Sequence, residues 1–167
     1  MNWTVPKTVV PARVPRVRIP PSPPEQLRAD YYTIEFMSDS IFTKIIKGEI
    51  PSHKIYEDDK TFAFLDIHPI QPGHILVVPK RQVEYVWDLD EEDYRALMAT
   101  AKLVAKRLRE VFPEKSRVAL LIEGLDVAHA HLKIFPFNTD SEFHNLPDMT
   151  TEPDRKELTN IAKRLAF

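Results

Sequence analysis

Five short segments of the chain have the hydrophobic pattern of β-strands. Residues 54–57 and 61–65 are rich in β-branched and aromatic side chains, and residues 74–79 are almost wholly apolar. Residues 118–122 form a further apolar run. In residues 127–136 small or aliphatic side chains alternate with histidine, lysine and phenylalanine side chains, which predicts a strand with two chemically different faces.

Apolar residues recur at helical spacing in other parts of the chain. Residues 40–47 predict a short helix, with a polar cap within 38–40 and Gly48 at its end. The longest predicted helix covers about 91–111, and an aspartate just before it is the expected N-cap, either Asp88 or Asp90.

The spacing also predicts a final helix over 152–166, capped by Thr151. The predicted order is helix, three or four strands, long helix, two strands and helix. This order is typical of an α+β domain rich in antiparallel pairing.

The first 36 residues differ in composition from the rest. They hold seven of the fifteen prolines and none of the three glycines. Prolines this close together rule out a continuous helix and favour an extended arm. We therefore predict a disordered N-terminal extension over 1–36, with Met37 as a possible second start, and a folded domain over 37–167. A proline-rich docking segment is the alternative.

Composition limits the classes of function. The chain has no cysteine, so disulfides and thiolate metal sites are excluded. Its net charge of −2 gives no case for bulk nucleic-acid binding. No apolar run approaches the roughly 18 residues that span a membrane. We predict a cytoplasmic protein without a membrane segment.

The alternating segment carries the most distinctive side chains. Ala130, Leu132 and Ile134 point to one predicted face, and the other face holds His129, His131, Lys133 and Phe135. A row of two imidazoles and an ammonium can hold a phosphate, and neutral imidazole can attack phosphorus. One alternative is a structural polar face. Another is zinc binding by the two histidines, which the Lys133 cation and a missing third ligand disfavour.

Other candidates lie at strand ends. His74 begins a strand after the Pro72-Gly73 turn, and Asp66 ends one, a typical position for a carboxylate that holds a ligand hydroxyl. Each residue alone also fits an ordinary turn role.

Four motifs in register resemble the histidine triad (HIT) superfamily, specifically its Hint-type branch. They are I-F-x-K-I-I-x-G-E-I-P at 41–51, F-A-F-L-D-I-x-P at 62–69, P-G-H-I-L-V-V-P-K at 72–80 and E-G-L-D-V-A-H-A-H-L-K-I-F-P at 123–136. The resemblance implies a five-stranded antiparallel sheet with a long helix and a C-terminal helix. It also implies a homodimer paired through the long helix and a sheet edge.

The resemblance implies an enzyme that binds purine nucleoside monophosphates or their conjugates, without a cofactor or metal. By position, His131 is the nucleophile that forms a nucleotidyl-histidine, His129 orients it, and His74 lies near the phosphate. Asp66 is the carboxylate that holds the ribose. The apolar slot for the base is formed by Phe42, Ile45, Ile50, Phe64 and Ile67.

Two departures from the family pattern affect the mechanism. Lys133 stands where the family has its third histidine, and it keeps a cation but cannot be a neutral proton acceptor at its ordinary pKa. The loop before the motif has Asp126 and lacks the hydroxyl residue of many relatives. Three hypotheses stay open: a nucleotide hydrolase or phosphoramidase, a nucleotidyl transferase, and a non-catalytic nucleotide-binding module.

Overall fold

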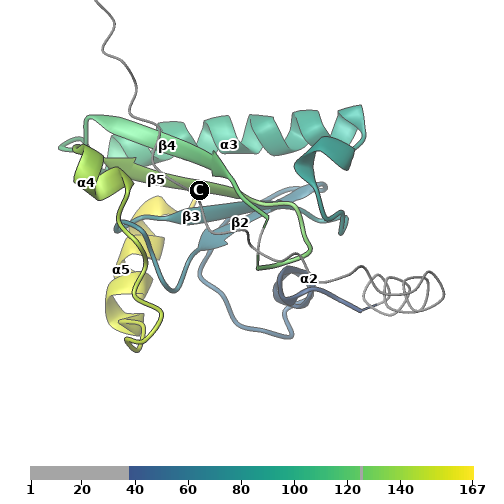
Figure 1. The fold of residues 1–167 in the computed structure, drawn as a ribbon, viewed down its shortest axis with the longest axis horizontal. Coiled ribbons are helices and arrows are strands. Elements are labelled where there is room, and N and C mark those ends of the chain that lie inside the picture. The colour runs from purple at the N-terminus through teal and green to yellow at the C-terminus, as the bar shows by residue number, and fades with distance from the viewer. Residues whose placement is uncertain (1–37, 125) are drawn as a thin grey trace, which may run out of the picture. The chain divides into compact units, whose positions relative to one another are not determined.

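A five-stranded antiparallel sheet forms the centre of the domain (Figure 1). The computed structural model describes residues 38–124 and 126–167. The strands run in the spatial order β1-β2-β3-β5-β4. Their bounds are β1 Lys54–Glu57, β2 Thr61–Leu65, β3 Ile75–Pro79, β4 Arg117–Ile122 and β5 Leu132–Phe137. The predicted fold class is confirmed.

Two helices cover one face of the sheet. The long helix α3, Glu91–Val111, and the C-terminal helix α5, Arg155–Leu165, share one apolar core with inward side chains of the strands (Figure 1). Leu97, Val104 and Leu108 of α3 pack there with Leu132 and Ile134 of β5. The alternation of Ala130, Leu132 and Ile134 toward one core is therefore confirmed.

The opposite face of the sheet carries the short helix α2, Ile41–Ile46. Its Phe42 packs on a cluster formed by Phe62, Phe64, Leu76 and Val78. Because both faces are covered, all five residues of β2 and of β3 are buried. This explains why β3 is an unbroken apolar run in the sequence.

The ends of α2 and α3 follow their predicted caps. Ser40 is the N-cap of α2, and its hydroxyl accepts the Thr43 N–H at 3.0 Å. Gly48, just beyond that helix, has φ +78°, a conformation that favours glycine. Asp90 caps α3, which decides between the two candidate aspartates.

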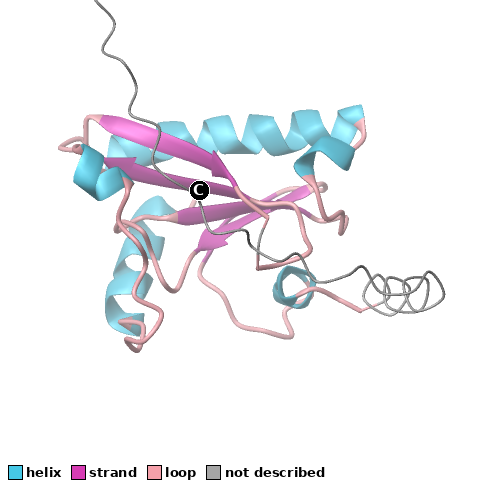
Figure 2. Ribbon diagram, in the orientation of Figure 1, coloured by secondary structure: helices cyan, strands magenta, loops and turns pink. Residues whose placement is uncertain are grey.

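The predicted strand over 127–136 is wrong in its first half. β5 begins only at Leu132, and Figure 2 shows residues 126–131 as loop. The backbone there is held elsewhere: the Ala130 N–H donates to the Val83 carbonyl at 2.6 Å, and the His129 N–H donates to Val127 at 2.8 Å. These residues therefore do not join the sheet ladder.

The predicted start of the last helix is also wrong. α5 begins at Arg155, because the Asp154 carboxylate accepts the N–H groups of Lys156 and Glu157. The Thr151 hydroxyl, the predicted cap, instead donates to Asp148.

Two short helices were not predicted. They are the 3-10 helix Val86–Asp88 and α4, Asp140–Phe143. A sequence signal for α4 exists, because Thr139 caps it and Glu142 stands three residues later, as in a capping box.

The predicted N-terminal extension, 1–36, lies outside the described residues. Within the described part, no helix is both long and apolar enough to cross a membrane.

Candidate active site

His129 is fixed through both of its ring nitrogens. Its Nε2 lies 2.8 Å from the Pro79 carbonyl oxygen, and its Nδ1 lies 2.7 Å from the Ser40 hydroxyl. The residue is fully buried, and burial lowers the pKa of its imidazole. A carbonyl oxygen only accepts, so the neutral ring carries its hydrogen on Nε2, and Nδ1 accepts from Ser40.

The backbone of His129 in turn fixes His131. The His131 Nδ1 lies 2.8 Å from the His129 carbonyl oxygen. By the same reasoning the neutral His131 ring carries its hydrogen on Nδ1, which leaves a lone pair on Nε2. Burial, and to a smaller degree the Lys133 charge, lowers the pKa of His131. The ring is therefore held neutral with one nucleophilic nitrogen.

Aromatic side chains pack beside this pair. The Phe42 ring meets His131 edge-on at a centroid distance of 5.2 Å and His129 at 5.8 Å. Phe64 lies 5.7 Å from Phe42, and Ile45 packs on the same cluster. Three of the five predicted slot residues are thus brought together beside the histidines.

The other two predicted slot residues lie apart from that cluster. Ile50 is half-buried just beyond α2. Ile67 is 50% exposed and lines a different hollow, described below.

Asp66 and His74 form a second group of polar side chains. The Asp66 carboxylate accepts the His68 N–H at 2.9 Å, and its other oxygen lies 3.5 Å from the His74 Nδ1. Burial raises the pKa of Asp66. The same Nδ1 accepts the Ile70 N–H at 3.3 Å, so the neutral His74 carries its hydrogen on Nε2.

Burial lowers the pKa of His74 to about 3, with smaller contributions from the charges of Lys133 and His131. Its Nε2 has no hydrogen-bond partner among the described residues, although the side chain is only 1% exposed. His74 therefore stays neutral, with a buried hydrogen on Nε2.

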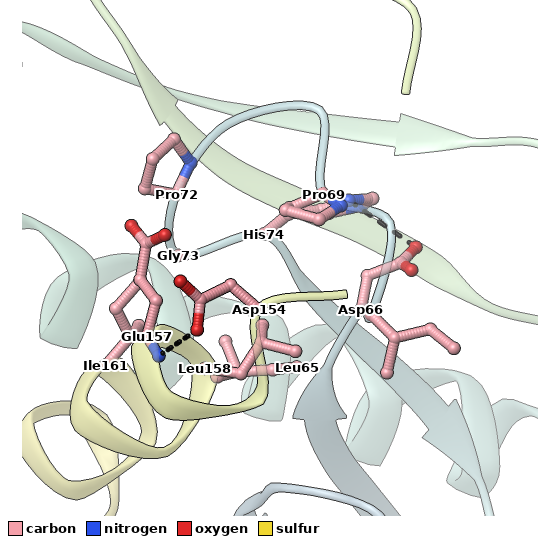
Figure 3. A pocket seen from close by; sticks show the side chains of 11 residues that line it. Leu65, Asp66, Pro69, Pro72, Gly73, His74, Asp154, Glu157, Leu158 and Ile161 are labelled. Carbon is pink, nitrogen blue, oxygen red and sulfur yellow. Dashed lines mark hydrogen bonds and ion pairs between the residues drawn. The ribbon is translucent and has the colours of Figure 1, made fainter. Parts of the chain in front are cut away.

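A hollow of about 400 Å³, counting space open to solvent, lies beside Asp66 and His74 (Figure 3). The N-terminal part of α5 forms its other wall through Asp154, Glu157 and Leu158. His129 and His131 do not line it. Asp66 and His74 line this hollow, and both are also coupled electrostatically to His131, whose charge is among the causes of their pKa shifts.

The sequence predicted that the Lys133 ammonium lies in one row with the two imidazoles, where it can hold a phosphate. In the structure this ammonium forms an ion pair instead of extending freely beside the histidines. The ammonium lies 2.6 Å from the carboxylate of Glu123, a residue just beyond β4. The Lys133 charge still affects the pKa values of Asp66, His74 and His131. The cation is therefore at the site, but a carboxylate already compensates it.

Sequence reasoning missed Glu123, Ser40 as a partner of His129, and Gln82. Glu123 follows β4 directly, and it shares a face with Lys133 because Leu121, two positions earlier, pairs with Lys133 on the adjoining strand. The side-chain oxygen of Gln82 accepts from the Ser40 N–H at 2.8 Å and from the Thr43 hydroxyl at 2.6 Å. Asp126, the other departure from the family pattern, is exposed.

The site residues do not form an evident metal site. Among residues 38–124 and 126–167, no group of three or more histidine, aspartate or glutamate side chains could hold a metal ion.

Comparison with known proteins establishes the family. The model of the HIT domain matches residues 47–140. The chain is 34% identical over 137 residues to Protein hit of Bacillus subtilis, covering 75% of this chain and 94% of that protein. The chain belongs to the HIT family, as the motifs predicted.

Two further relatives are informative. The adenosine 5'-monophosphoramidase HNT1 of Saccharomyces cerevisiae is 36% identical over 129 residues, covering 75% of this chain and 79% of that protein. The crystal structure of a HIT-like protein from Bartonella henselae aligns with a TM-score of 0.65 at 29% identity, covering 76% of this chain and 94% of that chain.

Proposed function

We propose that this protein is a hydrolase of nucleoside 5'-phosphate conjugates, phosphoramidates in particular, with His131 as its nucleophile. The observation that carries the proposal is the His131 Nδ1–H bond to the His129 carbonyl, which leaves the Nε2 lone pair for attack. The yeast relative named a phosphoramidase supports the substrate class.

The reaction has two displacements at the α-phosphorus. In the first, His131 Nε2 forms a bond to phosphorus while the bond from phosphorus to the leaving nitrogen breaks. That nitrogen takes a proton from solvent and departs as an amine. In the second, water attacks phosphorus and gives up a proton to solvent, the bond from phosphorus to His131 breaks, and a nucleoside monophosphate and the neutral imidazole are released. A covalent intermediate divides one difficult displacement into two easier ones.

The remaining site residues bind the nucleotide in this proposal. Asp66 accepts hydrogen bonds from the ribose, because one of its oxygens is held only loosely at 3.5 Å from His74. Phe42, Ile45 and Phe64, which pack beside the histidines, contact a purine base. The unused Nε2–H of His74 donates toward the phosphate side of the site.

We also propose that the protein is a cytoplasmic homodimer. β4 is an edge strand of the sheet. Leu120 and Ile122 on that strand and Leu103 on α3 are each 40% to 42% exposed. An open strand edge beside exposed aliphatic side chains favours pairing with a second copy. Sedimentation of the wild type beside Leu120→Lys tests this, and an unchanged mass would contradict it.

The test of function is incubation with an adenosine phosphoramidate. We expect release of the monophosphate by the wild type, and a covalent nucleotidyl adduct in intact-mass spectra after rapid acid quenching. His131→Ala should lose at least about 10³-fold in kcat, the scale for removing a covalent nucleophile, and should form no adduct. Near-normal turnover by His131→Ala would refute the mechanism.

The same experiment separates the two alternative functions. If water releases the wild-type adduct slowly but an added alcohol or phosphate acceptor releases it quickly, this would indicate a nucleotidyl transferase. Monophosphate binding without adduct or turnover would indicate a binding module.

A further inference from the structure

The hydroxyl of Ser40 connects α2 to His129. It accepts the Thr43 N–H at 3.0 Å, which caps the helix, and it lies 2.7 Å from the His129 Nδ1. The opposite nitrogen of the ring lies 2.8 Å from the Pro79 carbonyl. The Thr43 hydroxyl lies farther from the same Nδ1, at 3.4 Å. One serine hydroxyl thus forms both the helix cap and the shorter of the two hydroxyl contacts to Nδ1 of the buried ring.

The directions of these hydrogen bonds follow from their partners. The Pro79 carbonyl can only accept, so the neutral ring donates from Nε2 and has a lone pair at Nδ1. The single Ser40 hydrogen therefore points to His129. Gln82 supports this arrangement, because its side-chain oxygen accepts the Ser40 N–H at 2.8 Å and the Thr43 hydroxyl at 2.6 Å. The Thr43 hydrogen is thereby directed away from the ring.

The position of His129 matters because its carbonyl oxygen receives the Nδ1–H of His131 at 2.8 Å. A rotation or a change of tautomer in the His129 ring would release its contact with Pro79 or Ser40. The loop backbone that carries this carbonyl would then lose its anchor, and so would the orientation of the His131 Nε2.

We propose that Ser40 is a positioning residue for the nucleophile: by donating to His129 Nδ1 it fixes the neutral Nε2–H tautomer of that ring and, through the His129 carbonyl, the aim of His131. This role deepens the proposed hydrolase function and rests on it. It also connects two parts of the site, since the helix that Ser40 caps carries Phe42 and Ile45 of the proposed base slot.

Three substitutions of Ser40 separate its two functions. Ser40→Thr keeps a hydroxyl that caps and donates. Ser40→Asp keeps an acceptor for the Thr43 N–H, but presents only acceptors to His129 Nδ1. Ser40→Ala removes both. The matched control is Thr139→Ala, which removes the hydroxyl cap of α4, where Thr139 accepts the Glu142 N–H at 3.2 Å.

We expect kcat of Ser40→Ala and Ser40→Asp to fall by about 10- to 100-fold, the range known for hydrogen-bond partners that orient metal-bound histidines. KM should change less than kcat. Ser40→Thr and Thr139→Ala should stay within about threefold of the wild type, which is below about 0.7 kcal/mol. If cap loss alone were responsible, Ser40→Asp would behave as the wild type, and that result would overturn the proposal.

The second readout is the state of His129 itself, from side-chain 15N NMR of the full-length protein at neutral pH. The neighbouring titratable group is His131, whereas Ser40, Thr43 and Gln82 are neutral. We expect one neutral Nε2–H tautomer in the wild type and in Ser40→Thr. Ser40→Asp should convert His129 to the imidazolium form, since Nδ1 would donate to the carboxylate while Nε2 still donates to the Pro79 carbonyl, and only the imidazolium carries both hydrogens.

Failure of this proposal is distinguishable from failure of the proposed function. An unchanged His129 tautomer and charge in both Ser40→Asp and Ser40→Ala would refute the role of Ser40, whatever the turnover. A wild type with the expected tautomer but no turnover of phosphoramidate would refute the hydrolase proposal and leave the fixing of His129 by Ser40 supported.

Discussion

The ion pair between Lys133 and Glu123 offers a test of how the site binds phosphate. Glu123→Gln keeps the shape of the side chain and removes its charge. The Lys133 ammonium now lies 2.6 Å from that carboxylate. In the variant it would be free to turn toward an anionic ligand beside His131.

The effect of Glu123→Gln on stability should be small. The Lys133 and Glu123 side chains are 20% and 40% exposed, and pairs with this access to solvent contribute about 0.2–1 kcal/mol. Screening by solvent places this pair in the lower half of that range. We therefore expect a fall in Tm of no more than about 3 °C. Glu142→Gln is a matched control, because Glu142 and Lys115 form a similarly exposed pair at 2.9 Å, with Glu142 on α4.

The effect on ligand binding should be larger and of opposite sign. A hydrogen bond to a charged group contributes about 1.5–3 kcal/mol. Because Glu123 already occupies the ammonium, part of that contribution is absent in the wild type. We expect Glu123→Gln to tighten nucleoside monophosphate binding by up to about tenfold, or about 1.4 kcal/mol, and the gain to shrink as salt is raised.

Calorimetry of Glu123→Gln, Lys133→Ala and the double variant checks this reasoning. The gain should vanish in the double variant, since it needs the lysine. Lys133→Ala should lose more activity than Lys133→Arg, which keeps the charge but changes its geometry, and Lys133→His should keep or raise phosphoramidase turnover. Unchanged or weaker binding by Glu123→Gln would show that Lys133 does not reach the ligand.

Three further predictions concern the rest of the site and the chain. Asp66→Ala should weaken nucleoside monophosphate binding by about 1.5–3 kcal/mol in calorimetry, through the loss of hydrogen bonds from the ribose to a charged group, and equal affinity would remove Asp66 from the site. The stability of the domain in urea should fall as pH drops below 6.5 toward about 3, because the unfolded chain binds a proton at His74 that the folded protein does not. For His74 the free energy of unfolding changes by at most about 1.4 kcal/mol per pH unit. His129 and His131, whose pKa values are also lowered, act in the same direction, whereas Asp66, whose pKa is raised, opposes them above its ordinary value of 3.8. A pH profile of stability that His74→Gln leaves unchanged would contradict this. A protein that starts at Met37 should match the full chain in Tm and turnover, and a large drop in either would show that residues 1–36 support the domain.

Most of the fold could be predicted from local pattern. α3 has the predicted bounds because its apolar residues recur at helical spacing over 21 residues and an aspartate precedes them. β1 and β2 also have the predicted bounds. The start of α5 could not be fixed this way, because Thr151 and Asp154 are both good caps and only their contacts decide between them.

The site could be predicted only in part. Motif order placed Phe42, Phe64, His129 and His131 in one region, and the structure brings them together. The Glu123 carboxylate at Lys133 could not be read from the sequence, because it depends on the register of β4 against β5. The same holds for Ser40, whose contact with His129 joins residues 89 positions apart.

The wrongly predicted half of the histidine strand shows how the site is built. In a regular strand the carbonyl of a residue points along the sheet toward the neighbouring strand, and the side chain two positions later stands perpendicular to the sheet. The His129 carbonyl could not then meet the His131 ring. Because the chain joins the ladder only at Leu132, that carbonyl instead accepts the His131 Nδ1–H at 2.8 Å. The irregular backbone over residues 127–131 is thus what leaves the His131 Nε2 with its lone pair, whereas alternation alone would only have placed the two rings on one face.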